Sequence, residues 1–538
     1  SGSGGPTPDH AAQFNASMVS SDYRTGLAIY GFYRDRGSFD ANNDGFSEIT
    51  SLNNSTLGSR FFQRFGNRGK MAVDFFNIRE DRRGGNRFEY PLHEADIAEA
   101  VTHQITTAAV TYEHFTREYD LLSVFFSGQH VDRDSYYGAN RSLDGYGHTT
   151  DFSYNTGLQY KALMGSSTLT GGLEYSGGLL KDKKLGYPEW NESQNGGTSG
   201  PTHVENTIVS HQSASNAGAF AQYDFQWNRL LVSFGGRVDH YQIEDLEKQF
   251  ETKKGTVFSP RLNLLYNLSP SLQGRLSYSK GYRAPQIYDE DLHIESSGSR
   301  RVIHVNAPDL REETSRSFMA SAEWIRQWGT SNLRILAEGF YTRLNNPFAN
   351  EYGLPDEEGT VVYTRVNADG GATVRGVNTE MNLVTGNRFN LTAGFSFQSN
   401  RYDQEQEFGE TRFLRTPGSH GFMSIGKEFP DNWEMAATAT YTGEMLLPYF
   451  GPALSVPEEG ELRTSATFFD LGFRLQKQLT VGTSDLKIFA GVKNLLNAYQ
   501  GDFDFGIERD PGYMYGPAQP RTIYLGVKIG NRAGHQSS

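Results

Sequence analysis

Apolar and polar residues alternate one by one along much of this chain, and this period of two constrains the fold more than any other feature. In 389–397, Phe389, Leu391 and Phe395 alternate with Asn, Thr, Gly and Ser. The segment 522–529 repeats the pattern with branched aliphatic residues. Such alternation indicates strands with one apolar and one polar face. No stretch shows a helical period of comparable quality, so we predict an all-β fold.

Composition narrows the classes of all-β protein. The chain has 538 residues with 36 Phe, 29 Tyr and 59 Gly, and its mean hydropathy is −0.57. Apolar runs such as 445–450 are far shorter than the roughly 18 residues that a spanning helix needs. Low hydropathy with many aromatic residues is expected when only every second strand residue faces lipid. We therefore predict a transmembrane antiparallel β-barrel in a lipid bilayer.

Several other functions are excluded or disfavoured. The chain has no Cys, which excludes disulfides, zinc-thiolate and Fe–S sites and Cys nucleophiles. The net charge of −13 argues against a nucleic-acid partner, because phosphate contacts need clustered Lys and Arg. No serine-nucleophile elbow, zinc-protease helix or phosphate loop appears in a supporting context, so we predict no enzymatic activity and no covalent cofactor.

The connections alternate between tight and long. Tight turns lie at 65–69, 163–166 and 481–484, whereas polar stretches such as 181–210 and 283–310 are long. Short periplasmic turns and long extracellular loops are typical of outer-membrane barrels. Counting segments predicts about 21 strands. In this count, 361–385 is one long strand with a bulge at Gly370 and Gly371.

The direction of the end strands predicts a missing strand. The first segment, 11–20, ends in a tight turn, and the last, 521–529, follows a long loop, so both run the same way. Antiparallel closure then needs one further strand, because an open edge in lipid leaves backbone groups unpaired. We expect that strand upstream or on a separate chain. The predicted layout is a loop remnant or linker at 1–10, the barrel at 11–530 and a tail at 531–538.

Three segments resemble a known family. The run 258–292 resembles a strand–turn–strand unit of TonB-dependent outer-membrane receptors that ends in an Arg-Ala-Pro signature, here Tyr-Arg-Ala-Pro at 282–285. The segments 374–380 (VRGVNTE), 491–499 (GVKNLLNAY) and 519–530 (QPRTIYLGVKIG) resemble other parts of these barrels. The resemblance implies a 22-stranded barrel with an N-terminal plug, and import powered by TonB through that plug. Nothing in this chain resembles the plug.

The segment 40–48 resembles a short calcium loop. Asp40, Asn42 and Asp44 supply side-chain oxygens at positions one, three and five, and Gly45 stands at the sharp turn. Further candidate ligands are the carbonyl of Phe46 and the carboxylate of Glu48. The Glu of position twelve is missing. The alternative is a hairpin loop built on Asx turns.

Another candidate ligand site follows the Arg-Ala-Pro box. His293 and His304 lie between this box and the segment 306–310 (NAPDL), a layout that resembles haem receptors. Neutral imidazole is a suitable axial ligand for haem iron. Tyr282 and Tyr288 are the aromatic candidates for stacking on a planar ligand.

Cationic side chains on the polar faces of the strands are expected to point into the lumen. The residues with this prediction are Arg237, Arg275, Arg375, Lys487 and Lys493.

The predicted function is import of a large metal chelate. We expect a cobalamin-type corrinoid first, because of the calcium-like loop, then haem, then a ferric siderophore. Two alternatives stay open: a passive outer-membrane channel, and a surface scaffold that docks a lipoprotein cap on its loops.

Overall fold

The computed structural model describes residues 7–141, 143, 145–185, 188–190, 201–203, 206–248, 251–285, 301–352, 360–457, 459–510 and 512–531. Nearly all regular structure in these residues is β-strand. No helix among them is long and apolar enough to cross a bilayer.

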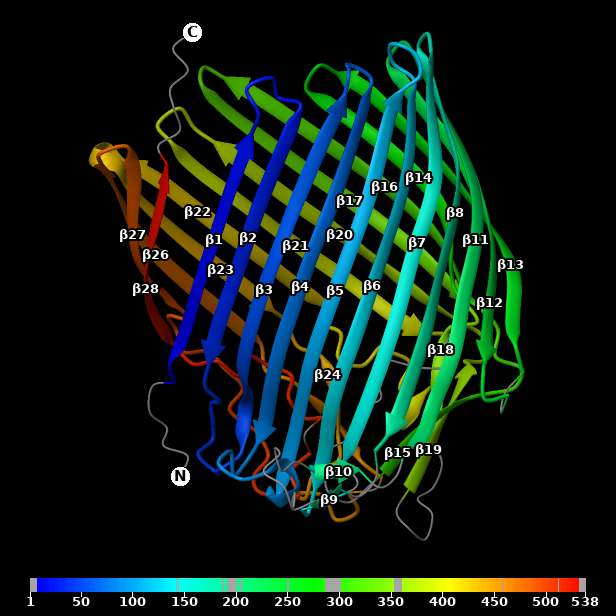
Figure 1. Cartoon of the computed structure of the whole chain (residues 1–538), viewed down its shortest axis with the longest axis vertical. Coiled ribbons are helices and arrows are strands. Elements are labelled where there is room, and N and C mark those ends of the chain that lie inside the picture. Colours follow the sequence, from blue (N-terminus) through cyan, green and yellow to red (C-terminus); the bar gives the residue numbers. More distant parts are fainter. Residues whose placement is uncertain are drawn as a thin grey trace, which may run out of the picture.

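One antiparallel sheet of 21 strands forms the wall of the barrel, which confirms the predicted fold class and strand number. Each strand pairs with the next barrel strand in chain order, and the strands are strongly tilted (Figure 1). The wall strands are β1 (Asp9–Val19), β2 (Thr25–Arg36), β3 (Ser47–Phe65), β4 (Gly69–Gly85), β5 (Ile97–Phe115), β6 (Leu121–Ala139), β7 (Tyr146–Met164), β8 (Ser167–Lys184), β11 (Thr207–Trp227), β12 (Leu230–Asp245), β13 (Lys253–Ser269), β14 (Leu272–Arg283), β16 (Glu313–Trp328), β17 (Ser331–Asn345), β20 (Gly371–Val384), β21 (Phe389–Tyr402), β22 (Ser419–Phe429), β23 (Trp433–Thr442), β26 (Phe468–Val481), β27 (Ser484–Lys493) and β28 (Thr522–Asn531).

The remaining elements belong to the loops. They are β9 (Pro188–Trp190) and β10 (Pro201–His203), the three-stranded sheet of β15 (Arg301–Asn306), β18 (Phe348–Tyr352) and β19 (Thr360–Asn367), the hairpin of β24 (Leu446–Tyr449) and β25 (Glu461–Thr464), and the 3₁₀ turns η1 (Leu92–Glu94), η2 (Glu407–Gly409) and η3 (Pro430–Asn432). All of them except η3 gather at one end of the barrel, which we call the loop end; it is the lower end in Figure 1. The turn η3 is the tight connection between β22 and β23. The tight connections lie at the opposite, turn end.

Several of the tight turns need a left-handed backbone. Gly165 and Gly482 have φ of 62° and 60°, and a Cβ added at either would meet nothing within 4 Å. Two-residue hairpin turns whose twist matches the strands require such positive φ values, which glycine adopts without steric cost.

The two faces of the wall follow the sequence alternation. On β28, Ile523 and Leu525 are 79% and 84% exposed, and they alternate with Tyr524 and Lys528. Along each strand, large exposed apolar residues stand at every second position and mark the lipid-facing side, whereas the positions between them face the lumen. We call these two sets of positions the lipid-facing parity and the lumen parity. Arg237, Arg275, Lys487 and Lys493 lie on the lumen parity of their strands, as predicted.

The prediction for Arg375 is wrong. This residue shares its face of β20 with Val377, which is 48% exposed. Its partner on β17 is Tyr341, which is 43% exposed on the lipid-facing side. Arg375 therefore lies on the outside of the wall. The strand register decides this, and the sequence of 371–384 taken alone does not show it.

The reading of 361–385 as one bulged strand is also wrong. Residues 360–367 form β19, which pairs in parallel with β15 and antiparallel with β18, outside the barrel sheet. The wall resumes only at Gly371, where β20 pairs with β17.

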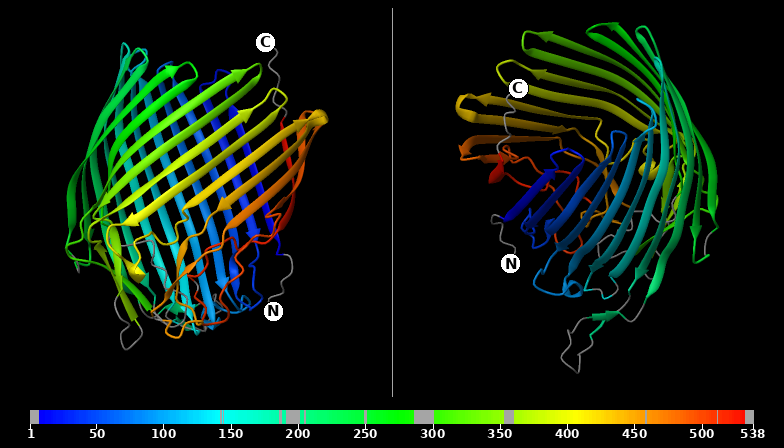
Figure 2. Two further views of the ribbon diagram at one scale, coloured as in Figure 1. Left: turned by 180° about the vertical axis from the view of Figure 1, so that it is seen from behind. Right: turned by 45° about the horizontal axis from the view of Figure 1, so that its top comes forward.

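The strands β1 and β28 are the edges of the sheet. Among the described residues, β1 pairs only with β2, and β28 pairs only with β27. Both edge strands run from the loop end to the turn end (Figures 1 and 2), because β1 leads into the tight turn before β2 and β28 follows the long connection after β27. Two neighbouring strands of the same direction do not complete an antiparallel ladder.

Candidate functional site at the loop end

The long connection 494–521, between β27 and β28, is fixed by a buried glutamine. Gln500 is fully buried; its Nε2 donates to the carbonyl of Tyr513 (2.8 Å), and its Oε1 accepts from the backbone N–H of Tyr515 (2.9 Å). One side chain thereby holds two parts of the loop together, because its buried amide must satisfy both its donor and its acceptor.

An aromatic cluster packs the same loop against the β24–β25 hairpin. The rings of Tyr449 and Tyr513 meet edge to face at a centroid distance of 4.8 Å. The guanidinium of Arg463 lies 3.3 Å from the centroid of Tyr449. Tyr449 is fully buried and Tyr513 nearly so. These contacts stabilise a folded platform at the loop end.

Carboxylates satisfy the phenols of this cluster. Asp502 accepts from the hydroxyls of Tyr513 (2.8 Å) and Tyr515 (2.6 Å), and Asp504 accepts from that of Tyr449 (2.7 Å). Burial, reinforced by the Asp502 carboxylate, raises the pKa of Tyr513 to about 12. Burial also raises the pKa of Asp510, whose Oδ2 accepts from the backbone N–H of Phe450 (2.9 Å).

The calcium-like loop comes together, but a guanidinium binds two of its acids. Oxygens of Asp40, Asp44 and Glu48 lie within 4.8 Å of one another. The Arg509 guanidinium binds Asp44 and also donates to Glu48 at 2.8 Å. The side chains of this ion-pair cluster are between 1% and 10% exposed. The positive charge near these acids is therefore supplied by the chain itself.

The other expected ligands are also committed to hydrogen bonds. Asp40 accepts backbone N–H groups from Asn43 (2.7 Å) and Gly45 (2.8 Å), which is Asx-turn geometry. Asn42 donates to the carbonyl of Asp504 (2.9 Å). The Phe46 ring lies under the Arg509 guanidinium at 4.8 Å. This arrangement does not fit a calcium ion, and it agrees with the Asx-turn alternative.

Tyr282 lies in a polar network of the barrel wall. Its hydroxyl donates to Asn216 Oδ1 (3.3 Å), and its ring stacks on Tyr241 at 6.0 Å. The Tyr241 hydroxyl donates to Glu312 (2.9 Å). Asn216 also donates to Asp239 (3.0 Å), which ties Tyr282 to lumen-facing charges.

Sequence reasoning did not find Tyr241, Asn216 and Glu312 beside Tyr282. The nearest signal was the alternation of Arg237, Asp239 and Tyr241 on one face of β12. The strand contacts of β11 and β12 bring Asn216 opposite Tyr241.

The structure does not test the remaining haem candidates. Tyr288 and His293 lie outside the described residues. His304 lies on β15, where its backbone pairs with that of Tyr363 on β19.

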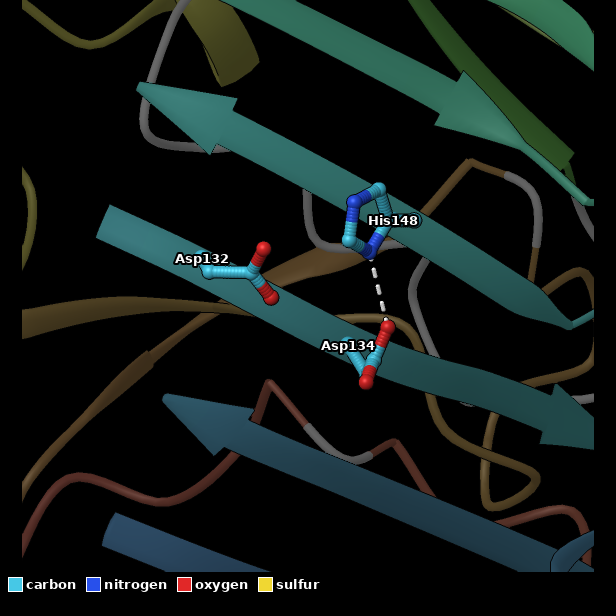
Figure 3. Close-up of side chains that lie close together, drawn as sticks. All are labelled: Asp132, Asp134 and His148. Atoms are coloured by element: carbon cyan, nitrogen blue, oxygen red, sulfur yellow. Dashed lines mark hydrogen bonds and ion pairs between the residues drawn. The ribbon is translucent and has the colours of Figure 1, made fainter. Parts of the chain in front are cut away.

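A mixed acid and histidine cluster lies near the loop end of β6 and β7 (Figure 3). Ligand atoms of Asp132, Asp134 and His148 lie within 4.8 Å of one another. His148 Nδ1 is 2.8 Å from an oxygen of Asp134, its direct cross-strand partner. These residues share the lipid-facing parity with Phe126 and Phe152, which are 51% and 46% exposed.

The architecture defines the class as a large transmembrane barrel with a folded loop platform at one end. The family model described as "TonB dependent receptor-like, beta-barrel" matches residues 13–495. The chain belongs to this family, whose members are outer-membrane receptors and not enzymes.

A curated relative is the iron-regulated outer membrane virulence protein of Vibrio cholerae serotype O1. It is 25% identical over 336 residues, which cover 61% of this chain and 46% of that protein. The chain thus spans about half the length of the curated relatives that it matches.

Solved receptors share the fold. The ferripyoverdine receptor of Pseudomonas aeruginosa, bound to ferripyoverdine, aligns with a TM-score of 0.71 at 14% identity, over 96% of this chain and 69% of that chain. The ferric enterobactin receptor PfeA of the same species aligns with a TM-score of 0.70 at 15% identity, over 97% and 77%.

Proposed function

We propose that this chain is the barrel of a receptor that imports a ferric siderophore, with energy delivered by TonB through a plug. The observation that carries the proposal is the family match over 13–495. The relatives that share the fold carry iron chelates in their names, including ferripyoverdine and ferric enterobactin. The folded loop platform supports the proposal because its buried contacts hold the loops at the barrel mouth in a fixed arrangement.

As candidate solutes, a corrinoid and haem rank below a ferric siderophore. The corrinoid expectation depended on the calcium-like loop, and Arg509 binds Asp44 and Glu48 there. The haem expectation depended on His293 and His304, and no described contact supports it.

Uptake and binding test the proposal together. Cells that carry the intact gene are supplied with iron-59 as ferric catecholate, ferric hydroxamate or haem, or with cobalt-labelled cyanocobalamin. We expect uptake of one ferric siderophore, and loss of that uptake in a strain that lacks TonB. Uptake of haem or cyanocobalamin alone would overturn the choice of solute. Uptake that persists without TonB, with large steady conductance in planar bilayers, would favour the passive channel.

We further propose that one additional strand lies between β1 and β28, which gives 22 strands from the 21 observed. Cysteine pairs placed along β1 and β28 test this. Directly paired strands bring Cα atoms within about 7 Å and allow disulfides, whereas an intervening strand holds them about 10 Å apart. Disulfide formation along the pair would contradict the proposal. A lipoprotein cap on the loops also stays a prediction, which pull-down of a stoichiometric partner tests.

A further inference from the structure

Five basic residues from five consecutive wall strands lie together on the lipid-facing side near the loop end. The strand register places Lys280 of β14 opposite Arg316 of β16, and Arg316 opposite Arg343 of β17. Thr373 of β20 continues the row and stands between Arg343 and Arg401 of β21. Arg375 lies two residues from Thr373 on β20, closer to the middle of the wall and opposite Tyr341. We call Lys280, Arg316, Arg343, Arg375 and Arg401 the basic patch.

Lys280, Arg316, Arg343 and Arg401 lie directly beyond an aromatic row, and Arg375 lies level with this row, opposite Tyr341. Tyr278, Phe318 and Tyr341 are direct partners across β14, β16 and β17, one residue pair closer to the middle of the wall. Phe318 and Tyr341 are 53% and 43% exposed. Aromatic rows of this kind mark the interface between the acyl chains and the headgroups of the bilayer. Two residues along a strand are about 7 Å, so the four cations beyond the row lie at the level of the headgroups, and Arg375 lies at the interface itself.

Among the described residues, most of the positive charge in the patch has no acidic partner. Asp403 binds Arg343 (2.7 Å from Oδ1 to Nη1). The nearby Glu410 is occupied by Arg412 (2.6 Å), whose backbone bridges that of Arg401. Among the described residues, Lys280, Arg316, Arg375 and Arg401 form no ion pair or side-chain hydrogen bond, and the three arginines are exposed.

An apolar groove adjoins the patch on the side toward the middle of the wall. It has a volume of about 530 Å³, and its lining includes Leu276, Tyr278, Phe318, Ala320, Gly339 and Tyr341. Ala320 and Gly339 are direct cross-strand partners, and their small size opens the groove between larger neighbours. A Cβ added at Gly339 would meet nothing within 4 Å, so the space beside it is empty of protein.

We propose that the basic patch and this groove bind an acylated, phosphate-bearing lipid of the outer leaflet. The guanidinium groups match phosphate oxygens in charge and in bidentate geometry. Neighbouring strands are about 4.8 Å apart, so the row spans about 19 Å and reaches more than one phosphate. An acyl chain fills the groove, which faces lipid and would otherwise have poor contacts. Charge complementarity selects this occupant, because four cations of the patch have no partner in the described part of the chain and the patch lies at the height where lipid phosphates begin.

The test compares matched charge losses on the two faces of the wall. Arg316→Gln/Arg375→Gln removes two charges from the patch, and Arg261→Gln/Arg275→Gln removes two from the lumen face of β13 and β14. Binding of bis-phosphorylated lipid A is measured on the purified barrel in neutral detergent, beside dephosphorylated lipid A and inorganic phosphate. We expect the patch variant to bind bis-phosphorylated lipid A at least about tenfold more weakly, with the lumen variant unchanged.

A second variant tests the groove without changing charge. Ala320→Phe/Gly339→Leu fills the groove, and we expect it to weaken binding of bis-phosphorylated lipid A while leaving the circular dichroism spectrum of the barrel unchanged. Equal affinities of the native protein and the patch variant would overturn the proposal. So would equal binding of dephosphorylated lipid A, or equally tight binding of inorganic phosphate alone, because either removes the need for one half of the site.

Discussion

The loop end and the basic patch handle charge in opposite ways. At the loop end, Arg509 binds Asp44 and Glu48 inside the protein, and all three side chains are nearly buried. In the basic patch, Arg316 and Arg375 face outward and have no partner among the residues that the structure describes. Buried charges must be paired within the chain, whereas exposed charges can be neutralised from outside. The first arrangement therefore stabilises loops, and the second leaves a surface ready for an anion.

A third region shows that lipid-facing positions near the loop end are not basic everywhere on the wall. Asp132 and Asp134 (Figure 3) stand on the loop-end side of the exposed Phe126 of β6, and β6 lies on the opposite part of the wall from β14–β21 (Figure 1). Asp134 is bound by His148 at 2.8 Å. In the same region, Asp81 is 3.5 Å from Arg79 and accepts from Thr102 at 2.8 Å. The net positive charge is thus a local property of β14–β21.

Breaking the buried pair should have the largest effect. Arg509→Gln leaves Asp44 and Glu48 without their cation, and loss of one partner of a buried ion pair costs about 3–5 kcal/mol. We expect faster hydrogen exchange at the backbone of 41–46 and 502–510. The control is Arg412→Gln, whose pair with Glu410 is exposed. Unchanged exchange in Arg509→Gln would show that the ion pairs do not hold the loops.

The same variant also tests the calcium expectation. With Arg509 neutralised, the carboxylates of Asp40, Asp44 and Glu48 are expected to gain affinity for terbium, a luminescent calcium substitute. The native protein, in which Arg509 competes, should show weaker sensitised luminescence. Equal luminescence in both proteins would contradict the view that Arg509 takes the place of the ion.

Moving positive charge to the other part of the wall should have an intermediate effect. Asp132→Lys/Asp134→Lys creates a basic surface beside Lys181 and Lys183, which lie opposite Thr150 and His148. We expect about tenfold tighter binding of bis-phosphorylated lipid A, equivalent to about 1.4 kcal/mol. The neutral variant Asp132→Asn/Asp134→Asn should gain less. No gain in the lysine variant would mean that charge at this height does not control lipid binding.

The tyrosine platform should respond to pH in a smaller and directional way. The folded-state pKa of Tyr513 is raised from 10.0 to about 12, so its contribution to stability is present below pH 10 and is lost as the pH rises through about 12. In Asp502→Asn, we expect the pKa of Tyr513 to fall toward 10.0. Ultraviolet titration of tyrosinate checks this, with Asp485→Asn on β27 as the control. An unchanged titration would exclude Asp502 as a cause.

The exposed pair Glu410–Arg412 should have the smallest effect. The Arg412 guanidinium holds the pKa of Glu410 at about 2, below its usual 4.5. This contribution to stability is present above pH 4.5 and is lost as the pH falls through about 2. Because Arg412 is 52% exposed, Glu410→Gln should cost less than about 1 kcal/mol. Urea unfolding at neutral pH measures the change, and a larger loss would contradict the assignment.

Sequence alternation predicted the wall because the information is local. The sequence of a single strand such as β28 indicates which of its residues face lipid, as Ile523 and Leu525 show. The alternation does not say which strand pairs with which, and for this reason β19 was joined to β20 in the prediction. Its parallel pairing with β15 depends on contacts between residues about 60 positions apart in the sequence, such as Val302 and Val361.

The sites divide in the same way. The local spacing of Asp40, Asp44 and Glu48 correctly predicted that their carboxylates meet. Nothing local indicated Arg509, which lies 461 residues from Glu48. The basic patch had a usable signal, because Lys280, Arg316 and Arg343 each stand two residues from an aromatic residue of the lipid-facing parity. Only the register shows that these positions are neighbours.

The Arg509 ion pairs have a consequence for the margin between β1 and β28. Asp44 and Glu48 belong to the connection after β2 and the start of β3, and Arg509 belongs to the connection before β28, so these bonds join the two sides of the margin at the loop end. These ion pairs crosslink the two edges of the sheet at the place where the described backbone forms no hydrogen bonds between strands. The crosslink limits the distance between β1 and β28 at the loop end, and so keeps the opening at the width of the strand that is proposed to fill it.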